Sequence, residues 1–488
     1  MDKNIIVYKS SIRVENYEMG DCGKLERILS VWDKVTFRFT FFGYIYDEIN
    51  KTLILPRGFD VSYLNYLLPD YKVKYDNSYD ANSFCVFNCN SEPKTDEQKK
   101  AIEFLLKASD DYPQKMLVCK TGFGKTFCTI YTLSKIQKKA MIIVDMERIQ
   151  EQWKEEFTNL TNISENDIYF ISGRQSIEKL MKSSKPAPYK IYISTHRTLS
   201  NYLKQEDDLT ALDKFFNKLR IGVKIFDEAH VEYMNILTID MLTNTYNTFY
   251  LTATPERSDF KENKLYENVF KTVPKYGQHL RFTNNYHNVT MISFNSEPDL
   301  TFIHKCKTRY GFDGNKYSKY LFSTAIDWTY DLIKRLLDKI IDKSGKTAIV
   351  LHRNEDIQIL YDLLTSDYLP NKYSDKSETD IKEIIGIFSM LTPKAERSLQ
   401  LEKQLILTTD KSFGKALNVN GVRFLISFVT FGSIAPTEQL LGRLRKIEGK
   451  EVMMFDVFDR GFPSAANQAT LRKRFYKKKC KSLNIIEE

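Results

Sequence analysis

A short glycine-rich loop within MLVCKTGFGKTF, residues 116–127, constrains the fold of this chain more than any other feature. Apolar residues predict a buried strand that runs straight into the loop. Gly122 and Gly124 let the backbone turn so that its amide groups point at phosphate oxygens. Lys125 supplies a point charge for the β and γ phosphates, and the Thr126 hydroxyl can ligate magnesium. A helix that begins at Thr126 would add the positive end of its dipole.

A second motif supports this interpretation, which the loop alone leaves open. Cys119 stands where the usual pattern has its first glycine, so an ordinary glycine-rich turn is the alternative. The motif IFDEAH (225–230) follows another apolar strand. Asp227 can hold magnesium through water, and Glu228 can orient and deprotonate an attacking water. LTATP (251–255) ends a further strand, where its hydroxyl groups could contact the acidic pair, although alone it would fit a strand-to-turn junction. Together the three motifs predict nucleotide hydrolysis.

Short apolar strands alternate with helical segments along most of the chain, which predicts parallel α/β sheets. The first series lies at residues 116–119, 140–144, 191–194, 223–226 and 248–252, and the second at 347–351, 383–388, 405–409, 423–427 and 452–457. A polar zone separates the two series, so we expect two α/β domains in tandem. Residues 1–90 are rich in aromatic residues that alternate with polar ones, which predicts a small α+β domain with turns at 47–51 and 56–58.

These patterns predict four segments. Residues 1–90 form an accessory domain that could bind DNA or dock a protein. Residues 91–275 form the ATP-binding domain, 276–325 a linker or insertion, and 326–488 a C-terminal domain with a basic tail. In the linker, 305–320 mixes basic and aromatic side chains that could stack on bases, with an exposed linker as the alternative.

Composition excludes several classes of protein. With 42% hydrophobic and 28% charged residues among 488, the chain is predicted to be globular. It contains no apolar run long enough to span a membrane. Seven scattered cysteines are typical of a reducing compartment, and we expect a cytoplasmic protein. The net charge of +9 gathers partly at 471–481, which suits a polyanionic partner or a solvated face.

The motifs GFGKT, DEAH, LTATP and QLLGRLRK, in this order, resemble those of superfamily 2 helicases and translocases. The resemblance covers roughly residues 95–460 and is strongest to the DNA branch with XPB and type I restriction motors, including phage UvsW-like and poxvirus transcript-release helicases. Residues 408–422 resemble the UvsW form of the fifth motif, from which Ala416 and Asn418 depart. The resemblance implies two RecA-like domains, ATP and Mg²⁺ as cofactors, and Thr126 and Asp227 as the magnesium-binding residues.

The same resemblance implies roles for individual residues. Gln98 would read adenine, unless it is a solvent-facing helix residue. Gln439 and Arg443 would face the attacking water and the phosphate, with Arg443 as an arginine finger. Lys446 stands where a further arginine is usual, so either Arg445 takes that role through a shift of one residue or the second finger is weaker. The expected nucleotide-binding residues are Gln98, Thr121, Gly122, Phe123, Gly124, Lys125 and Thr126. The expected catalytic residues are Lys125, Asp227, Glu228, Gln439, Arg443 and Arg445.

Nucleic acid would cross both domains and be gripped alternately as ATP is bound and split. By family position, the expected contacts are Arg148, Thr195, Arg197, His352, Arg353, Thr408 and Thr409, with a surface polar residue as the alternative for each. Contacts to phosphates would make binding independent of sequence and sensitive to salt.

The leading hypothesis is an ATP-dependent DNA helicase or translocase that remodels single-stranded, duplex or branched DNA, with a viral origin and the host cytoplasm as its location. An RNA-directed or transcript-release motor is a second reading, and a non-hydrolysing nucleic-acid scaffold is a third. The motor subunit of a restriction complex is a further alternative. Partners would be replication, recombination or transcription proteins, and no membrane is expected.

Overall fold

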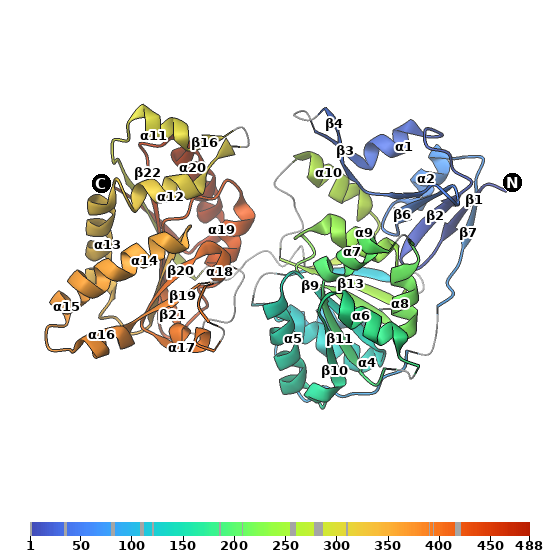
Figure 1. Ribbon diagram of the computed structural model, residues 1–488, viewed down its shortest axis with the longest axis horizontal. Coiled ribbons are helices and arrows are strands. Elements are labelled where there is room, and N and C mark those ends of the chain that lie inside the picture. Colours follow the sequence, from blue (N-terminus) through green and yellow to red (C-terminus); the bar gives the residue numbers. More distant parts are fainter. Residues whose placement is uncertain are drawn as a thin grey trace. The chain divides into compact units, whose positions relative to one another are not determined.

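The computed structural model describes the chain except residues 1, 34–36, 80–82, 108–111, 120–121, 185–186, 207, 254–259, 278–285, 309–310, 390, 394 and 415–420. The chain divides into two compact units, Met1–Arg281 and Phe282–Glu488. Each unit is built around a seven-stranded sheet that helices cover (Figure 1). Within the described residues, no helix has both the length and the apolar character needed to cross a bilayer.

The first unit opens with a small mixed sheet in the order β5-β6-β2-β1-β7. Its strands are β1 (Asn4–Val7), β2 (Ser11–Glu15), β5 (Ile45–Asp47), β6 (Thr52–Pro56) and β7 (Lys72–Tyr75), with helices α1 (Gly23–Ile28) and α2 (Val61–Leu67). A separate hairpin joins β3 (Ser30–Asp33) to β4 (Arg38–Phe42). The pairing of β1 with β7 is parallel and the other pairings are antiparallel. The predicted small α+β domain is therefore present.

A parallel sheet of seven strands in the order β10-β11-β9-β12-β13-β8-β14 forms the rest of this unit. The strands are β8 (Gln114–Val118), β9 (Ala140–Val144), β10 (Ile168–Ile171), β11 (Ile191–Thr195), β12 (Val223–Phe226), β13 (Asn247–Thr252) and β14 (Lys275–Tyr276). The helices are α3 (Asp96–Leu106), α4 (Lys125–Ile136), α5 (Glu147–Leu160), α6 (Gly173–Lys182), α7 (His196–Gln205), α8 (Ala211–Leu219), α9 (Tyr233–Met241) and α10 (Phe260–Val269). The central strands β9 and β12 are wholly buried, which explains why β9 is a continuous apolar run and why β12 is apolar except for Lys224.

The N-terminal sheet and the parallel sheet share one hydrophobic core. A single cluster of buried side chains includes Ile5 and Leu55 from the small sheet and Phe226 and Tyr250 from the large one. The backbones also meet closely, since a Cβ added at Gly58 would lie 2.5 Å from a carbonyl oxygen of α10. The small domain is therefore packed as part of the first unit.

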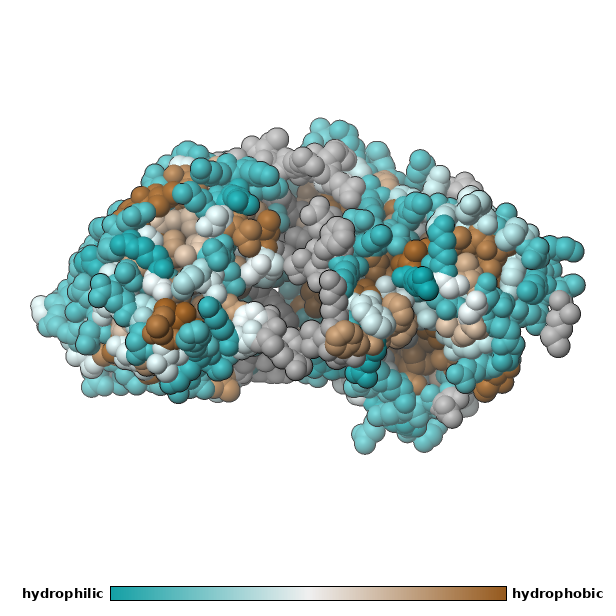
Figure 2. Space-filling view, turned by 90° about the horizontal axis from the view of Figure 1, so that it is seen from above, coloured by the Kyte–Doolittle hydropathy of each residue, from teal (hydrophilic) through white to brown (hydrophobic). Residues whose placement is uncertain are grey.

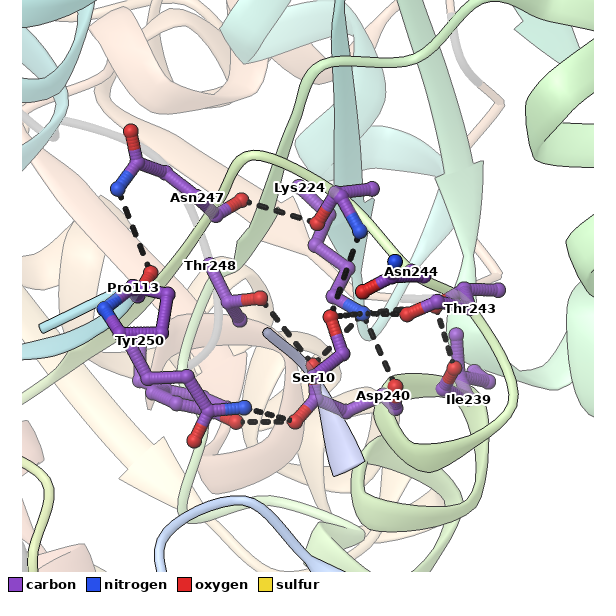
Figure 3. Close-up of polar contacts among 12 residues, drawn as sticks. Ser10, Pro113, Lys224, Ile239, Asp240, Thr243, Asn244, Asn247, Thr248 and Tyr250 are labelled. Carbon is purple, nitrogen blue, oxygen red and sulfur yellow. Dashed lines mark hydrogen bonds and ion pairs between the residues drawn. The ribbon is translucent and has the colours of Figure 1, made fainter. Parts of the chain in front are cut away.

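A buried polar network joins the strands of this unit near their N-terminal ends (Figure 3). The Lys224 ammonium lies 2.8 Å from a carboxylate oxygen of Asp240, and both side chains are almost completely buried. Lys224 also donates to the Ser10 hydroxyl at 3.1 Å. Asp240 in turn accepts hydrogen bonds from Gln114 on β8 and Tyr250 on β13, each at 2.6 Å. One carboxylate therefore links the strands that lead to all three sequence motifs.

The second unit contains a parallel sheet in the order β19-β20-β18-β21-β22-β15-β23. Its strands are β15 (His287–Phe294), β18 (Lys346–Leu351), β19 (Ile385–Phe388), β20 (Leu405–Thr409), β21 (Val422–Ser427), β22 (Val452–Asp459) and β23 (Ser482–Glu487). Its helices are α11 (Leu300–Lys305), α12 (Gly314–Leu321), α13 (Ile326–Ile340), α14 (Asn354–Leu363), α15 (Leu369–Lys372), α16 (Glu378–Ile384), α17 (Arg397–Glu402), α18 (Asp410–Gly414), α19 (Ile434–Leu441) and α20 (Pro463–Lys479). A turn of π-helix (Leu364–Tyr368) joins α14 to α15, and β16 (Lys307–Thr308) pairs with β17 (Gly311–Phe312).

Two features of the second unit differ from the sequence-based expectations. The segment predicted as a linker, 276–325, supplies β15, which pairs with both β22 and β23 inside the sheet. The basic stretch 471–481 lies largely on α20, and its Arg472 points inward. Arg472 is 2% exposed and binds both carboxylate oxygens of Asp456, at 2.8 and 2.9 Å. The surface itself is mostly hydrophilic on the face drawn in Figure 2, with scattered hydrophobic patches.

Candidate nucleotide-binding site

The glycine-rich loop connects the end of β8 to the start of α4, as the sequence predicts. Gly122 and Gly124 have φ angles of +82° and +92°, a region that side chains strongly disfavour. A Cβ at Gly124 would also lie 2.7 Å from the Gln98 amide nitrogen. Gly124 is the N-cap of α4, so Lys125 and Thr126 open the helix with their backbone amides unpaired along its axis. Thr121 lies outside the described residues.

Gln98 holds the loop from the side. Its amide nitrogen donates to the carbonyl oxygen of Phe123 at 2.9 Å, and its amide oxygen accepts from the backbone of Lys94 at 2.8 Å. The side chain is 9% exposed, which excludes a solvent-facing helix residue. Whether Gln98 also reads adenine stays a prediction.

Cys119, at the position before the loop, is buried and closely packed. The carbonyl oxygen of Cys119 accepts a hydrogen bond from the Lys125 ammonium at 2.9 Å. Burial raises the pKa of its thiol to about 12, so the group stays neutral and behaves as a small apolar side chain. A Cβ at the neighbouring Gly277 would meet the Cys119 sulfur at 2.6 Å. Cys119, at the position where glycine is usual, therefore packs against the loop as a small neutral side chain.

The acidic pair follows β12 directly. Asp227 is fixed by its backbone amide, which donates to Ile143 on β9 at 2.9 Å. One carboxylate oxygen accepts from the amide of Glu228 at 2.9 Å, and the other accepts from the Trp153 indole at 2.9 Å. Burial and the neighbouring charge of Glu228 raise the pKa of Asp227 to about 6, while the Trp153 hydrogen bond and the Lys125 charge act in the opposite direction. The charges of Asp227 and Lys125 therefore interact.

Glu228 is held in an unusual backbone conformation. Its φ is +47°, which is uncommon for a residue with a side chain and often marks a functional position. The Glu228 carboxylate lies 3.4 Å from a ring nitrogen of His230. The same nitrogen lies 3.0 Å from the Thr252 hydroxyl, and the amide of Ala229 donates to Leu251 at 2.8 Å. The DEAH and LTATP motifs are therefore in contact through His230 and Ala229. A contact of the LTATP hydroxyl groups with the acidic pair itself stays a prediction, and Thr254 and Pro255 lie outside the described residues.

The residues of this site fit a magnesium ion that a nucleotide helps to hold. Asp227 offers carboxylate oxygens and Thr126 a hydroxyl, the oxygen donors that Mg²⁺ prefers. In the described part of the chain, no group of three or more His, Cys, Asp or Glu side chains could hold a metal by itself. Magnesium commonly binds through one or two protein groups together with water and substrate phosphates.

Sequence reasoning missed two residues of this site. Trp153 supplies a hydrogen bond to Asp227 from α5, and its position in a helix gave no sign of that contact. His230 was visible as the last residue of DEAH, but its bond to Thr252 depends on the pairing of β12 with β13.

The second unit presents the predicted arginines after α19. Gln439 lies within this helix, and Arg443 and Arg445 follow its C-terminal end. All three side chains are half-buried. The amide of Arg443 donates to Leu440 at 3.1 Å, which continues the last turn of the helix. Their catalytic roles stay predictions.

The predicted nucleic-acid contacts of the first unit differ in exposure. Arg197 is exposed on α7, and Arg148 is half-buried in the first turn of α5. Thr195 is 7% exposed, and its hydroxyl caps α7 by accepting from the amide of Thr198 at 3.1 Å. Arg197 is therefore the best placed of the three to meet a phosphate.

Most of the residues predicted to contact nucleic acid in the second unit are buried or bind other residues of the same unit. Thr408 and Thr409 are buried, and Thr409 accepts from the amide of Ser412 at 3.1 Å. Arg353 pairs with Glu355 and Asp356 at 3.2 and 3.4 Å.

Burial also makes His352 and two tyrosines of this unit less available to a nucleic acid. It lowers the pKa of His352, whose ring nitrogen accepts from the amide of Thr430 at 3.3 Å. In 305–320, Tyr317 is completely buried and Tyr320 is 6% exposed, so neither ring is available to stack on bases. These two tyrosines belong to the core.

Comparison with known proteins agrees with this geometry. Residues 93–257 match the family model described as "Type III restriction enzyme, res subunit". The chain is 23% identical over 350 residues to the "Transcript termination protein A18" of Yaba monkey tumor virus (strain VR587), which covers 66% of this chain and 63% of that protein. The match thus spans less than two thirds of the relative's length.

Solved structures also resemble the chain. Saccharomyces cerevisiae Dbp5, in the structure titled "S. cerevisiae Dbp5 bound to RNA and ADP BeF3", matches with a TM-score of 0.53 at 12% identity, over 80% of this chain and 90% of that one. The structure titled "The crystal structure of T4 UvsW" matches over 100% of both chains with a TM-score of 0.38 and 14% identity. The likeness to Dbp5 agrees with two RecA-like domains. Residues 93–257 thus match one family model, and the ordered motifs of the chain are similar to those of superfamily 2 helicases.

Proposed function

We propose that this chain is an ATP-dependent DNA helicase or translocase that remodels single-stranded, duplex or branched DNA. One observation carries the proposal: the glycine loop with Lys125 follows β8, and the Asp227–Glu228 pair follows β12, so both lie at the C-terminal edge of one parallel sheet with β13 between the two strands. There the Asp227 pKa responds to the charge of Lys125. Charge neutralisation and a positioned base are what phosphoryl transfer requires.

In this proposal, Lys125 and the loop would bind the phosphates, and Thr126 and Asp227 would hold a magnesium ion, which would supply positive charge beside them. Glu228 accepts a proton from the attacking water. His230 would link Glu228 to β13, because its ring nitrogen lies 3.4 Å from the Glu228 carboxylate and 3.0 Å from the Thr252 hydroxyl.

Movement would come from the second unit. Arg443 would contact the γ-phosphate when the two units close, and Gln439 would face the attacking water. Hydrolysis removes the group that both units bind, so the units would part and release one grip on the nucleic acid. The chain's exposed Arg197 is the leading candidate for a backbone contact in the first unit.

A second candidate function is transcript release in viral transcription. The printed name of the A18 relative, "Transcript termination protein", favours it. Both functions require the same ATP site, so they differ only in the polynucleotide that stimulates turnover.

The test is phosphate release by the purified chain with a panel of single-stranded DNA, duplex DNA, forked DNA and RNA. We expect DNA to stimulate turnover, with forked or duplex DNA most effective. Stimulation by RNA alone would overturn the DNA assignment and favour an RNA-directed motor. If no polynucleotide led to phosphate release, the result would favour a non-hydrolysing scaffold and refute the proposed function.

A further inference from the structure

The indole of Trp153 contacts the proposed magnesium-binding carboxylate from behind. Trp153 lies in the middle of α5, is 1% exposed, and donates from its ring nitrogen to one oxygen of Asp227 at 2.9 Å. The other oxygen of Asp227 accepts from the backbone amide of Glu228 at 2.9 Å. Two donors from different elements therefore hold the two oxygens of one carboxylate.

The indole itself is rigidly placed. Its ring centroid lies 6.0 Å from that of Phe157 on the same helix, and Phe157 lies 6.3 Å from Phe87. These rings belong to the hydrophobic core on one face of the parallel sheet. An indole N–H can only donate a hydrogen bond and cannot bind a metal. Its role toward Asp227 is therefore limited to orientation and charge.

A carboxylate held in this way has little freedom to rotate. Each oxygen keeps a lone pair that neither donor occupies, and those lone pairs are what a metal's water shell would use. Groups that hydrogen-bond to metal ligands commonly fix the ligand's orientation, and their loss weakens metal binding or activity by about 10- to 100-fold. The backbone amide of Asp227 is also fixed by its hydrogen bond to Ile143, so only rotation of the side chain could change the orientation of the carboxylate.

We propose that Trp153 is a positioning residue of the nucleotide site, whose indole N–H sets the orientation in which Asp227 receives hydrated magnesium. This inference deepens the proposed function and rests on it. The competing explanation is that Trp153 only fills the core, in which case loss of the N–H would leave the dependence on magnesium unchanged.

The experiment compares Trp153→Phe with Phe157→Leu in the full-length chain. Trp153→Phe keeps an aromatic ring and removes the donor, whereas Phe157→Leu disturbs the same core and keeps the donor. The readout is the Mg²⁺ concentration that gives half-maximal binding of a fluorescent ATP analogue, measured without turnover. We expect this concentration to rise about 10-fold or more in Trp153→Phe and to stay near wild type in Phe157→Leu. Equal values in both variants would overturn the inference.

A second measurement keeps the inference testable if Trp153→Phe fails to fold. The chain has three tryptophans, and replacing Trp32 and Trp328 by Phe leaves Trp153 as the only one. We expect its emission to change when Mg²⁺ is added to the ADP-bound protein, because the charge beside the indole changes. Unchanged emission at Mg²⁺ concentrations that saturate analogue binding would contradict the contact.

Different results would rule out the proposed function and the role of Trp153. If the wild-type chain binds no magnesium-nucleotide complex, the proposed function and the role of Trp153 fall together. If the wild type binds it and the two variants behave alike, only the role of Trp153 is lost.

Discussion

The buried pair of Lys224 and Asp240 allows a stability prediction with a defined magnitude. Asp240→Ala leaves the ammonium buried without an anion, although its contacts to Ser10 and Thr243 remain. Removing one partner of a buried pair costs about 3–5 kcal/mol. Burial lowers the pKa of Lys224 and the charge of Asp240 opposes that shift, so the cost reflects an ammonium that has lost its compensation.

The reverse variant should cost less. In Lys224→Met the carboxylate of Asp240 keeps donors from Gln114, Thr248 and Tyr250. We therefore expect a loss near the lower limit, about 3 kcal/mol. Because neither charge is left unpaired in the double variant, its loss should fall below the sum of the single losses by about 2–3 kcal/mol.

The assay is urea unfolding followed by tryptophan emission in a Trp328→Phe background, so that Trp32 and Trp153 report on the first unit alone. An exposed pair of the same unit provides the matched control, since Lys214 and Asp208 lie 2.7 Å apart with 63% and 42% of their side chains exposed. Its coupling energy should be below about 1 kcal/mol. Equal coupling energies in the two pairs would show that burial does not strengthen the pair of Lys224 and Asp240.

Three further predictions follow from single groups. Burial lowers the pKa of Lys115 to about 8, so the unfolded chain binds more protons between that value and about 10.5, and stability should rise with pH by about 3 kcal/mol across this window. Lys115→Met should flatten that rise in melts at pH 7.5 to 10.5, and an unchanged slope would contradict the assignment. Gln98→Ala removes the bond to the glycine loop and should raise the KM for ATP roughly 2- to 10-fold in steady-state assays, whereas an unaltered KM would exclude a role in the loop. Arg443→Ala should lower kcat by about 10³-fold or more with nucleotide binding largely kept, while Arg445→Ala should lower it less; the opposite order would assign the finger to Arg445.

Much of the fold could be predicted because the central strands are buried on both faces. Burial on both faces makes β9, β12 and β13 largely apolar, and the predicted limits of each lie close to the observed ones. The strands β15 and β23 were missed for a physical reason as well. β23 is an edge strand with largely exposed side chains, so its sequence carries no unbroken apolar run. β15 follows a polar stretch that suggested a linker.

The chemistry of the site was similarly uneven in its predictability. Gly124, Lys125, Asp227 and Glu228 belong to local motifs, where spacing along the chain fixes spacing in the fold. The contact of Trp153 with Asp227 joins positions 74 residues apart and depends on where α5 packs. Arg472 shows the same limit, because a run of basic residues cannot reveal which one turns inward to a buried carboxylate.

Hydrolysis at this site is tested most directly by measuring phosphate release from ATP by the wild-type chain and by two variants, Lys125→Ala and Glu228→Gln, with a polynucleotide present in excess. We expect stimulated release by the wild type and essentially none by either variant, with Glu228→Gln still binding ATP because the loop that holds the phosphates is intact. Release by both variants at the wild-type rate would contradict this expectation.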